Sequence, residues 1–257
     1  MPKWFLKKPS KKVEIQTRFG FKIFVDPTFD ANIEHVIYER GVYELGTVSL
    51  LTHYLKKGDL FIDVGANIGF LSLVGAAQVG EEGEVIAFEP VPSTYHLLVE
   101  NKQLNNFNQL HPQPFALGSV NEHRTIFQEN QNRGGASIVN KHSAEGIQIE
   151  VVALDEMIFD QHVKMIKVDV EGFELEVLKG GEQLIRKDWP ILIVEHSTER
   201  ENVGKPTELM EWLSDLGNYE FYQLKRGKER KSGIIKINAS MDNLPTHDNI
   251  ICLPVRN

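Results

Sequence analysis

Acids and glycines at two strand ends have the pattern of a ligand site. Asp63 and Glu89 each lie at the end of a short apolar segment rich in strand-forming residues. Gly65 and Gly69 follow Asp63 and frame a tight turn before an apolar helix. A strand, a glycine turn and a helix N-terminus leave backbone N–H groups free to bind a ligand. In an open α/β sheet an acid at the tip of the next strand is placed to bind ribose hydroxyls, so the two segments predict a ligand that contains ribose.

The glycine spacing narrows the class of ligand. Residues 65–69 read GANIG, which has the spacing G-x-x-x-G and not the G-x-G-x-x-G of nicotinamide enzymes. The turn also lacks the Gly-Lys-Ser/Thr of a P-loop, so it has no lysine for a terminal phosphate. An acid at the entrance of the turn, Asp63, suits a cationic amino-acid group better than a pyrophosphate. Together with Glu89, this combination predicts S-adenosylmethionine as the cofactor.

Further acids and a histidine follow at the ends of two later strands. Asp169 and Glu171 come after one apolar segment, and Glu195 and His196 end another. The carboxyl ends of parallel strands meet at one edge of a sheet, so we expect Asp169 to face the same crevice as the cofactor turn. A carboxylate or a histidine there could act as general base on a hydroxyl acceptor, which contributes typically about 10²–10⁴-fold. Metal binding and helix capping are the other roles open to Asp169 and Glu171.

The elements that position these residues alternate along the chain. From residue 59 the order is strand, helix, strand, helix, which is typical of an α/β fold with a mostly parallel sheet and helices on both faces. The pattern predicts strands at 60–64, 84–88, 109–117, 163–168, 190–195, 219–224 and 248–253, and helices at 69–79, 92–105, 173–187 and 206–216.

Two regions lie outside this alternation. Residues 1–58 predict a small hairpin and two helices, a lid or platform ahead of the core. Residues 119–153 are predicted to form an insertion with two strands around a polar loop, in which Arg133 could reach an anionic acceptor. We see no internal repeat and no low-complexity linker, so residues 59–257 are predicted to form one domain that includes this insertion.

Composition limits the partners and the compartment. The chain has 257 residues and a net charge of −8 at pH 7, so we expect no nucleic-acid partner. Cys252 is the single cysteine, which excludes an intramolecular disulfide and a cysteine-based zinc site and favours a cytoplasmic location. No apolar segment of a secretory signal follows the N-terminal lysines. The longest weakly polar segment, 70–80, is too short to span a bilayer, so no integral membrane segment is expected. The sequence indicates no particular oligomeric state.

Five motifs in order carry a resemblance to a known family. They are DVGANIG at 63–69, FEP at 88–90, ALG at 116–118, IKVDVEG at 166–172, and Glu195. In this order and spacing they resemble the motifs of FkbM-type methyltransferases, over about residues 41–252. The resemblance implies a class I methyltransferase (Rossmann-like) fold, with a seven-stranded, mostly parallel sheet whose last strand is antiparallel. It also implies S-adenosylmethionine as methyl donor and a hydroxyl acceptor on a sugar, glycolipid or secondary metabolite.

The resemblance also implies roles for individual residues. The residues implied to bind the cofactor are Asp63, Gly65, Ala66, Asn67, Gly69, Glu89, Pro90, Ala116 and Leu117. Residues 65–67 would pack against the methionine part, and Asp63 would orient the turn and bind the amino-acid end. Glu89 would bind the ribose diol through charge-assisted hydrogen bonds. Ala116 and Leu117 would lie against the adenine.

Two alternative functions remain open from the residues alone. Residues 169–171, DVE, imitate the D-x-D motif of metal-dependent glycosyltransferases, and a non-catalytic protein that binds the cofactor would have the same glycine turn. Our prediction is an enzyme, a methyltransferase acting on a small-molecule or saccharide acceptor, with four candidate catalytic residues: Asp169, Glu171, Glu195 and His196. No compact ligand set such as H-x-x-H is present, so we predict no metal site.

Overall fold

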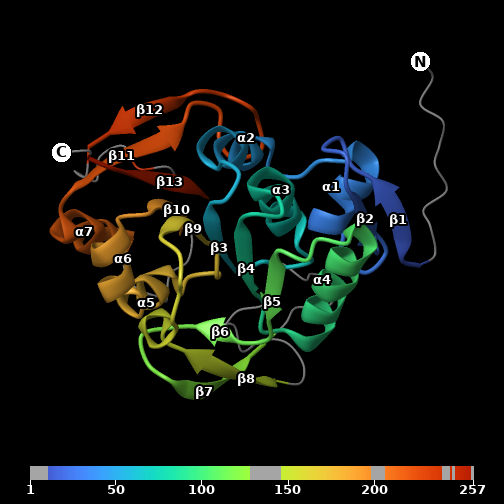
Figure 1. Ribbon diagram of the computed structural model, residues 1–257, viewed down its shortest axis with the longest axis horizontal. Helices are drawn as coiled ribbons and strands as arrows, with labels where there is room; N and C mark the ends of the chain where they lie inside the picture. Colours follow the sequence, from blue (N-terminus) through green and yellow to red (C-terminus); the bar gives the residue numbers. More distant parts are fainter. Residues whose placement is uncertain (1–10, 128–145, 198–205, 239–243, 245–246, 256–257) are drawn as a thin grey trace.

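Eight strands form a central sheet (Figure 1). They are β3 (Leu60–Val64), β4 (Glu84–Phe88), β5 (Leu110–Gln113), β9 (Val163–Val168), β10 (Ile191–Ser197), β11 (Tyr219–Leu224), β12 (Ile234–Ile237) and β13 (His247–Pro254). Their order across the sheet is β12-β11-β13-β10-β9-β3-β4-β5. The computed structural model describes residues 11–127, 146–197, 206–238, 244 and 247–255.

Strand directions confirm the predicted class I methyltransferase sheet. Strands β5, β4, β3, β9 and β10 run parallel to one another, and β13 runs antiparallel between β10 and β11. These seven strands match the predicted seven, with the last one antiparallel. An eighth strand that the sequence analysis did not predict, β12, pairs antiparallel with β11 at the sheet edge. Every residue of β3 is buried, as expected for a central parallel strand covered on both faces.

Helices cover both faces of the sheet. On one face lie α2 (Leu45–Tyr54), α3 (Phe70–Val79) and α4 (Pro92–Asn105), and on the other α5 (Glu174–Lys179), α6 (Glu182–Asp188) and α7 (Pro206–Leu216). The single helix predicted at 173–187 is in fact α5 and α6, which are separated at Gly180. A side chain there is excluded, because an added Cβ would lie 1.9 Å from the carbonyl oxygen of Gly118. In the part of the chain that the structure describes, no helix has the length and hydropathy needed to cross a membrane.

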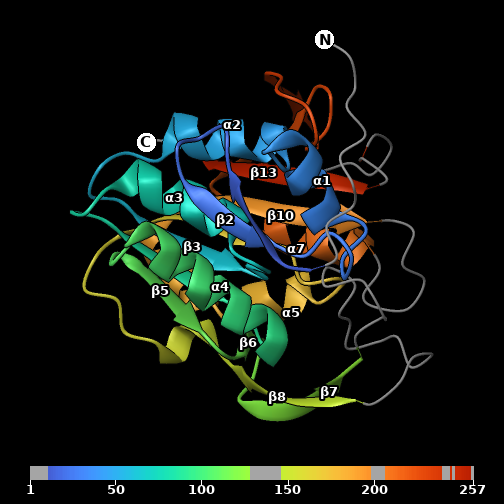
Figure 2. The same ribbon diagram turned by 90° about the vertical axis from the view of Figure 1, so that its right-hand side faces the viewer.

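A separate small sheet stands below the central one (Figure 2). The single strand predicted at 109–117 is in fact β5 and β6 (Ala116–Leu117), and β6 leaves the central sheet to pair with β8 (Ile147–Val152). Pro114 lies at the break and has no N–H group for a ladder hydrogen bond. Strand β7 (Glu122–Ile126) pairs antiparallel with β8, followed by the 3₁₀ turn η1 (Leu154–Glu156). Arg133, within the predicted insertion, lies outside the described residues.

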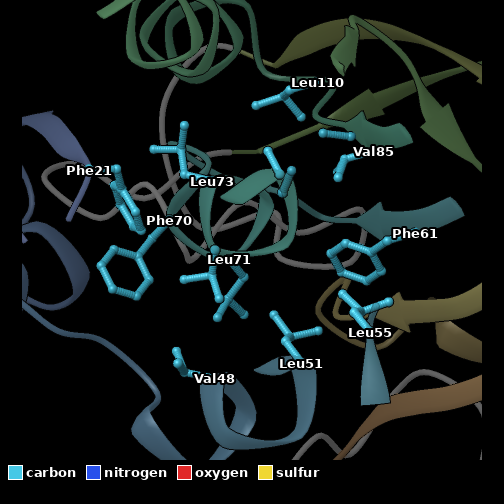
Figure 3. Packing of buried hydrophobic residues seen from close by; sticks show 14 of the residues in the cluster. Phe21, Val48, Leu51, Leu55, Phe61, Phe70, Leu71, Leu73, Val85 and Leu110 are labelled. Atoms are coloured by element: carbon cyan, nitrogen blue, oxygen red, sulfur yellow. The ribbon is translucent and has the colours of Figure 1, made fainter. Parts of the chain in front are cut away.

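The N-terminal segment packs on α3 and α4. It contains β1 (Val13–Gln16), β2 (Lys22–Val25) and α1 (Ile33–Arg40) before α2. The Phe21 ring meets the Phe70 ring of α3 edge-on at 5.6 Å, and Figure 3 shows both beside apolar side chains of α2. The Asn101 side chain of α4 accepts a 2.7 Å hydrogen bond from the Phe24 N–H. The segment thus shares its hydrophobic core with the sheet. The division into 1–58 and 59–257 stays a sequence-based prediction.

Candidate active site

The turn between β3 and α3 has a left-handed backbone at three positions. Gly65 has φ +80°, Asn67 φ 52° and Gly69 φ +89°, values that glycine adopts readily and asparagine tolerates. The N–H groups of Gly65 and Ala66 both donate to the carbonyl oxygen of Phe88, at 3.0 and 2.9 Å. The turn is therefore tied to the end of β4, which brings the first two predicted motifs together.

Glu89 braces this turn. Its side chain accepts hydrogen bonds from the Asn67 N–H at 3.0 Å and from the Val91 N–H at 2.9 Å. The residue is 7% exposed, and Pro90 beside it is partly buried. Glu89, which is predicted to bind the ribose, therefore also holds the turn in shape.

Asp63 lies fully buried behind the turn. The Ser72 hydroxyl donates to its Oδ2 at 2.6 Å, while Oδ1 has no hydrogen-bond partner among the described residues. Burial raises the pKa of Asp63, and the nearby Lys167 ammonium and the Ser72 hydrogen bond oppose that rise. A buried acceptor without a partner costs about 1–3 kcal/mol, which a ligand donor could recover.

Lys167 forms an ion pair with Asp169 at the end of β9. The ammonium lies 3.1 Å from Asp169 Oδ2, and the lysine and aspartate side chains are 4% and 17% exposed. Burial alone would lower the pKa of Lys167, but Asp169 and Asp63 outweigh it and the pKa is raised. The lysine therefore stays charged beside both acids.

The structure brings three of the four predicted catalytic residues together. Carboxylate oxygens of Asp169, Glu171 and Glu195 lie within 4.8 Å of one another, close enough to hold a cation. Glu171 has a left-handed backbone with φ 57°. Glu174, the first residue of α5, accepts hydrogen bonds from the N–H groups of Val170 at 3.3 Å and Gly172 at 3.0 Å, and so holds the loop that carries Glu171.

The environments of Asp169 and Glu195 move their pKa values apart. Burial would raise the pKa of Asp169, but Lys167 and Lys228 overcome this and hold it well below its usual range. Burial, followed by the Asp169 charge, raises the pKa of Glu195 to about 8. The two environments thus favour the ionised form of Asp169 and the protonated form of Glu195, the arrangement by which paired acids divide base and acid roles.

His196 does not join this cluster. Side chains alternate along a strand, and Glu195 lies on the face of Ile193 whereas His196 lies on the face of Val194, under α5–α7. The residue is 1% exposed. The prediction that Glu195 and His196 open together onto one crevice is therefore wrong, because adjacent strand residues point to opposite faces.

The two residues predicted to contact adenine lie in different surroundings. Ala116 is partly buried and packs against the apolar cluster that contains Val91, two residues after Glu89. Leu117 is 1% exposed and belongs to the core between the sheet and α5–α7. Contact of both residues with adenine stays a prediction, and Ala116 is the more accessible of the two.

Sequence reasoning missed Lys228, whereas Glu44 was considered both as a residue that reaches the ligand and as a packing or capping residue. Lys228 Nζ lies 2.6 Å from Glu195 Oε1 and 3.2 Å from Glu44 Oε1. Lys228 belongs to the charged segment 225–231, which is indistinguishable from a solvated turn in the sequence. Its pairing depends on residues 33 positions before it and on the N-terminal segment, so no local motif could have indicated it.

The sheet order, the glycine turn after β3 and the acids at the ends of β4, β9 and β10 define a class I methyltransferase. The model of the methyltransferase FkbM domain family matches residues 63–220, more than half of the chain. The chain belongs to this family of methyltransferases. Membership of this family favours a methyltransferase over both alternatives, the glycosyltransferase and the non-catalytic binding protein.

Individual relatives are also named as methyltransferases. "Methyltransferase 1" of Beauveria bassiana is 22% identical over 190 residues, covering 65% of this chain and 74% of that protein. "Hexuronic acid methyltransferase AglP" of Haloferax volcanii is 33% identical over 141 residues, covering 53% of this chain and 56% of that protein. The chain thus spans little more than half of AglP. A solved structure from Clostridium thermocellum, provisionally named an rRNA-methylase, is 13% identical with TM-score 0.51 over 81% of this chain and 92% of that one, which shows the fold.

Proposed function

We propose that this methyltransferase transfers a methyl group from S-adenosylmethionine to a hydroxyl oxygen of a saccharide, glycolipid or other small hydroxylated molecule. The observation that carries the proposal is the position of an ionised Asp169 beside the Gly65 turn. The Asp169 N–H donates to the Val64 carbonyl at 3.0 Å, directly before that turn. The residue proposed to accept the proton is thus hydrogen-bonded to the end of the strand that leads into the predicted cofactor turn.

The residues of the turn fit this cofactor. Gly65 lets the turn pack directly against the end of β9, because an added Cβ would lie 1.9 Å from the Asp169 carbonyl oxygen. Asp63 Oδ1 is a buried acceptor suited to the amino group, directly or through a water. Glu89 would hold the ribose hydroxyls, since its carboxylate stands at the tip of β4.

The acids at the sheet edge supply the proton chemistry. S-adenosylmethionine, when bound, provides an electrophilic methyl group on a sulfonium. The acceptor oxygen would bond to that methyl carbon as the carbon–sulfur bond breaks, leaving the demethylated cofactor as a neutral thioether. Asp169, kept ionised by Lys167 and Lys228, would take the proton of the acceptor hydroxyl. Alignment of donor and acceptor accounts for most of the remaining rate. Glu195, with its pKa raised to about 8, stays protonated at neutral pH and so limits repulsion in the cluster.

A saccharide acceptor is supported by one relative. AglP is named as a hexuronic acid methyltransferase and is 33% identical to this chain over 141 residues. Sugar hydroxyls are also acceptors that need a base. We therefore place saccharides first among the acceptors to be screened.

The experiment that tests this function has two steps. Calorimetry measures binding of S-adenosylmethionine and of its demethylated product, and a labelled-methyl screen then covers saccharides, glycolipids and small hydroxylated metabolites. We expect binding of both ligands and transfer to a hydroxyl in at least one class. If neither ligand binds, the proposed function is overturned.

Glu89→Ala is expected to weaken S-adenosylmethionine binding by about 1–3 kcal/mol, because charged hydrogen bonds are lost. Calorimetry measures the change, with Glu84→Ala as the matched control at the other end of β4. Part of the effect comes from the turn, since Glu89 also holds the Asn67 N–H. Equal affinity of Glu89→Ala and the unaltered chain would rule out the ribose role.

A further inference from the structure

Lys228 joins two parts of the chain at the acid cluster. It lies in the loop between β11 and β12, and its side chain is 11% exposed. Its ammonium is 2.6 Å from Glu195 Oε1 at the end of β10 and 3.2 Å from Glu44 Oε1 at the start of α2. The Glu44 side chain is fully buried. A buried lysine between two buried carboxylates links the N-terminal segment to the proposed site.

Backbone contacts hold Lys228 in this position. Its N–H donates to Asp248 Oδ1 at 2.9 Å, and its carbonyl oxygen accepts from the Gly46 N–H at 2.7 Å. A Cβ on Gly46 would lie 2.8 Å from the carbonyl oxygens of Gly227 and Lys228, so α2 and the loop meet backbone to backbone. The backbone of Lys228 is therefore fixed, and its side chain extends from that point to the two acids.

The charge of Lys228 acts on both acids of the pair. Burial lowers the pKa of Lys228, but Asp169, Glu44 and Glu195 outweigh burial and the lysine stays charged. In turn, Lys228 lowers the pKa of Asp169 and opposes the rise that burial causes in the pKa of Glu195.

We propose that Lys228 is a positioning residue of the methyl-transfer site, whose ammonium ties Glu195 to Glu44 and so holds Glu195 beside Asp169. The proposal rests on the proposed function, because it assigns Lys228 to the site in which Asp169 acts as base. It gives the N-terminal segment a role at that site through Glu44.

The test is a carbon-13 NMR titration of the side-chain carboxyls in the full chain, with the signals assigned from Asp169→Asn and Glu195→Gln. Lys228→Gln keeps a hydrogen-bond donor but removes the charge. We expect its Asp169 and Glu195 titration midpoints to move upward, because carboxylates that lose a nearby positive charge bind protons more tightly. Lys228→Arg keeps the charge and is expected to titrate like the unaltered chain.

Lys236→Met is the matched control. It removes a lysine from the same hairpin, whose ammonium lies 2.5 Å from Glu220 on the exposed side, and should leave both midpoints in place. If Lys228→Gln does not fold, the double variant Lys228→Gln/Glu44→Gln removes the charge together with its buried partner and is titrated instead. A smaller upward shift is expected there, because loss of the Glu44 charge acts in the opposite direction.

Three outcomes overturn the proposal: unchanged midpoints in a folded Lys228→Gln chain, unchanged midpoints in the double variant, or a Lys228→Arg chain that titrates like Lys228→Gln. A lower melting temperature without a shift in the midpoints would assign Lys228 a structural role only. Calorimetry of S-adenosylmethionine with the unaltered chain separates the two proposals. Absence of binding overturns the proposed function, whereas binding with unchanged midpoints overturns the role of Lys228 alone.

Discussion

Asp169→Asn is expected to lower methyl transfer by about 10²–10⁴-fold while S-adenosylmethionine still binds, because the variant loses only the general base. The amide has the shape of the carboxylate and can still accept a hydrogen bond from Lys167, which lies 3.1 Å from Asp169 Oδ2. It cannot take the proton of the acceptor hydroxyl. Turnover is measured with labelled methyl groups and the acceptor found in the screen, and cofactor affinity by calorimetry.

Asp188→Asn is the matched control for this variant. Asp188 is also buried and accepts a 2.8 Å hydrogen bond from the Val163 N–H, at the opposite end of β9. Its substitution should affect stability and leave turnover per folded molecule unchanged. If Asp169→Asn retains full turnover and Glu195→Gln loses it, the base is Glu195, whose pKa of about 8 would then give activity that increases as the pH rises towards and past that value.

Elements with a strong periodic pattern were predictable from the sequence, and elements that end at a tertiary contact were not. Strands β3, β4, β9 and β11 have the predicted bounds because each is an apolar segment between turn residues. The break between α5 and α6 depends on the approach of Gly180 to the Gly118 backbone, 62 residues earlier, and no helical pattern records it. Strand β12 has only four residues, IIKI, at a sheet edge, and so short a segment gives no periodic pattern from which to predict a strand.

The site divides in the same way. Asp63, Gly65 and Glu89 were predictable because a turn and a strand end bear a local pattern, and the parallel sheet brings Asp169 to the same edge. Lys228 and Glu44 pair across 184 residues of chain, so no local sequence pattern indicated this ion pair. The error at His196 was avoidable, because the period of two in a strand already separates it from Glu195.

Gly65→Ala is expected to lose both stability and cofactor binding. The alanine would keep φ near +80°, which costs roughly 1–2 kcal/mol for a residue with a Cβ. Its methyl group would also lie 1.9 Å from the Asp169 carbonyl oxygen and 3.3 Å from Val170 Cγ1. Such overpacking costs roughly 1–3 kcal/mol more. The end of β9 must then move away from the turn, which separates Asp169 from the cofactor. Urea unfolding and calorimetry with S-adenosylmethionine measure the two losses.

Gly217→Ala isolates the backbone part of this effect. Gly217 also has a positive φ, +68°, but an added Cβ there would meet nothing within 4 Å. We expect Gly217→Ala to lose only the conformational cost and to bind the cofactor normally. The difference between the two variants measures the close approach of the turn to β9, so equal losses would mean that β9 moves freely and that this approach does not hold Asp169 at the cofactor turn.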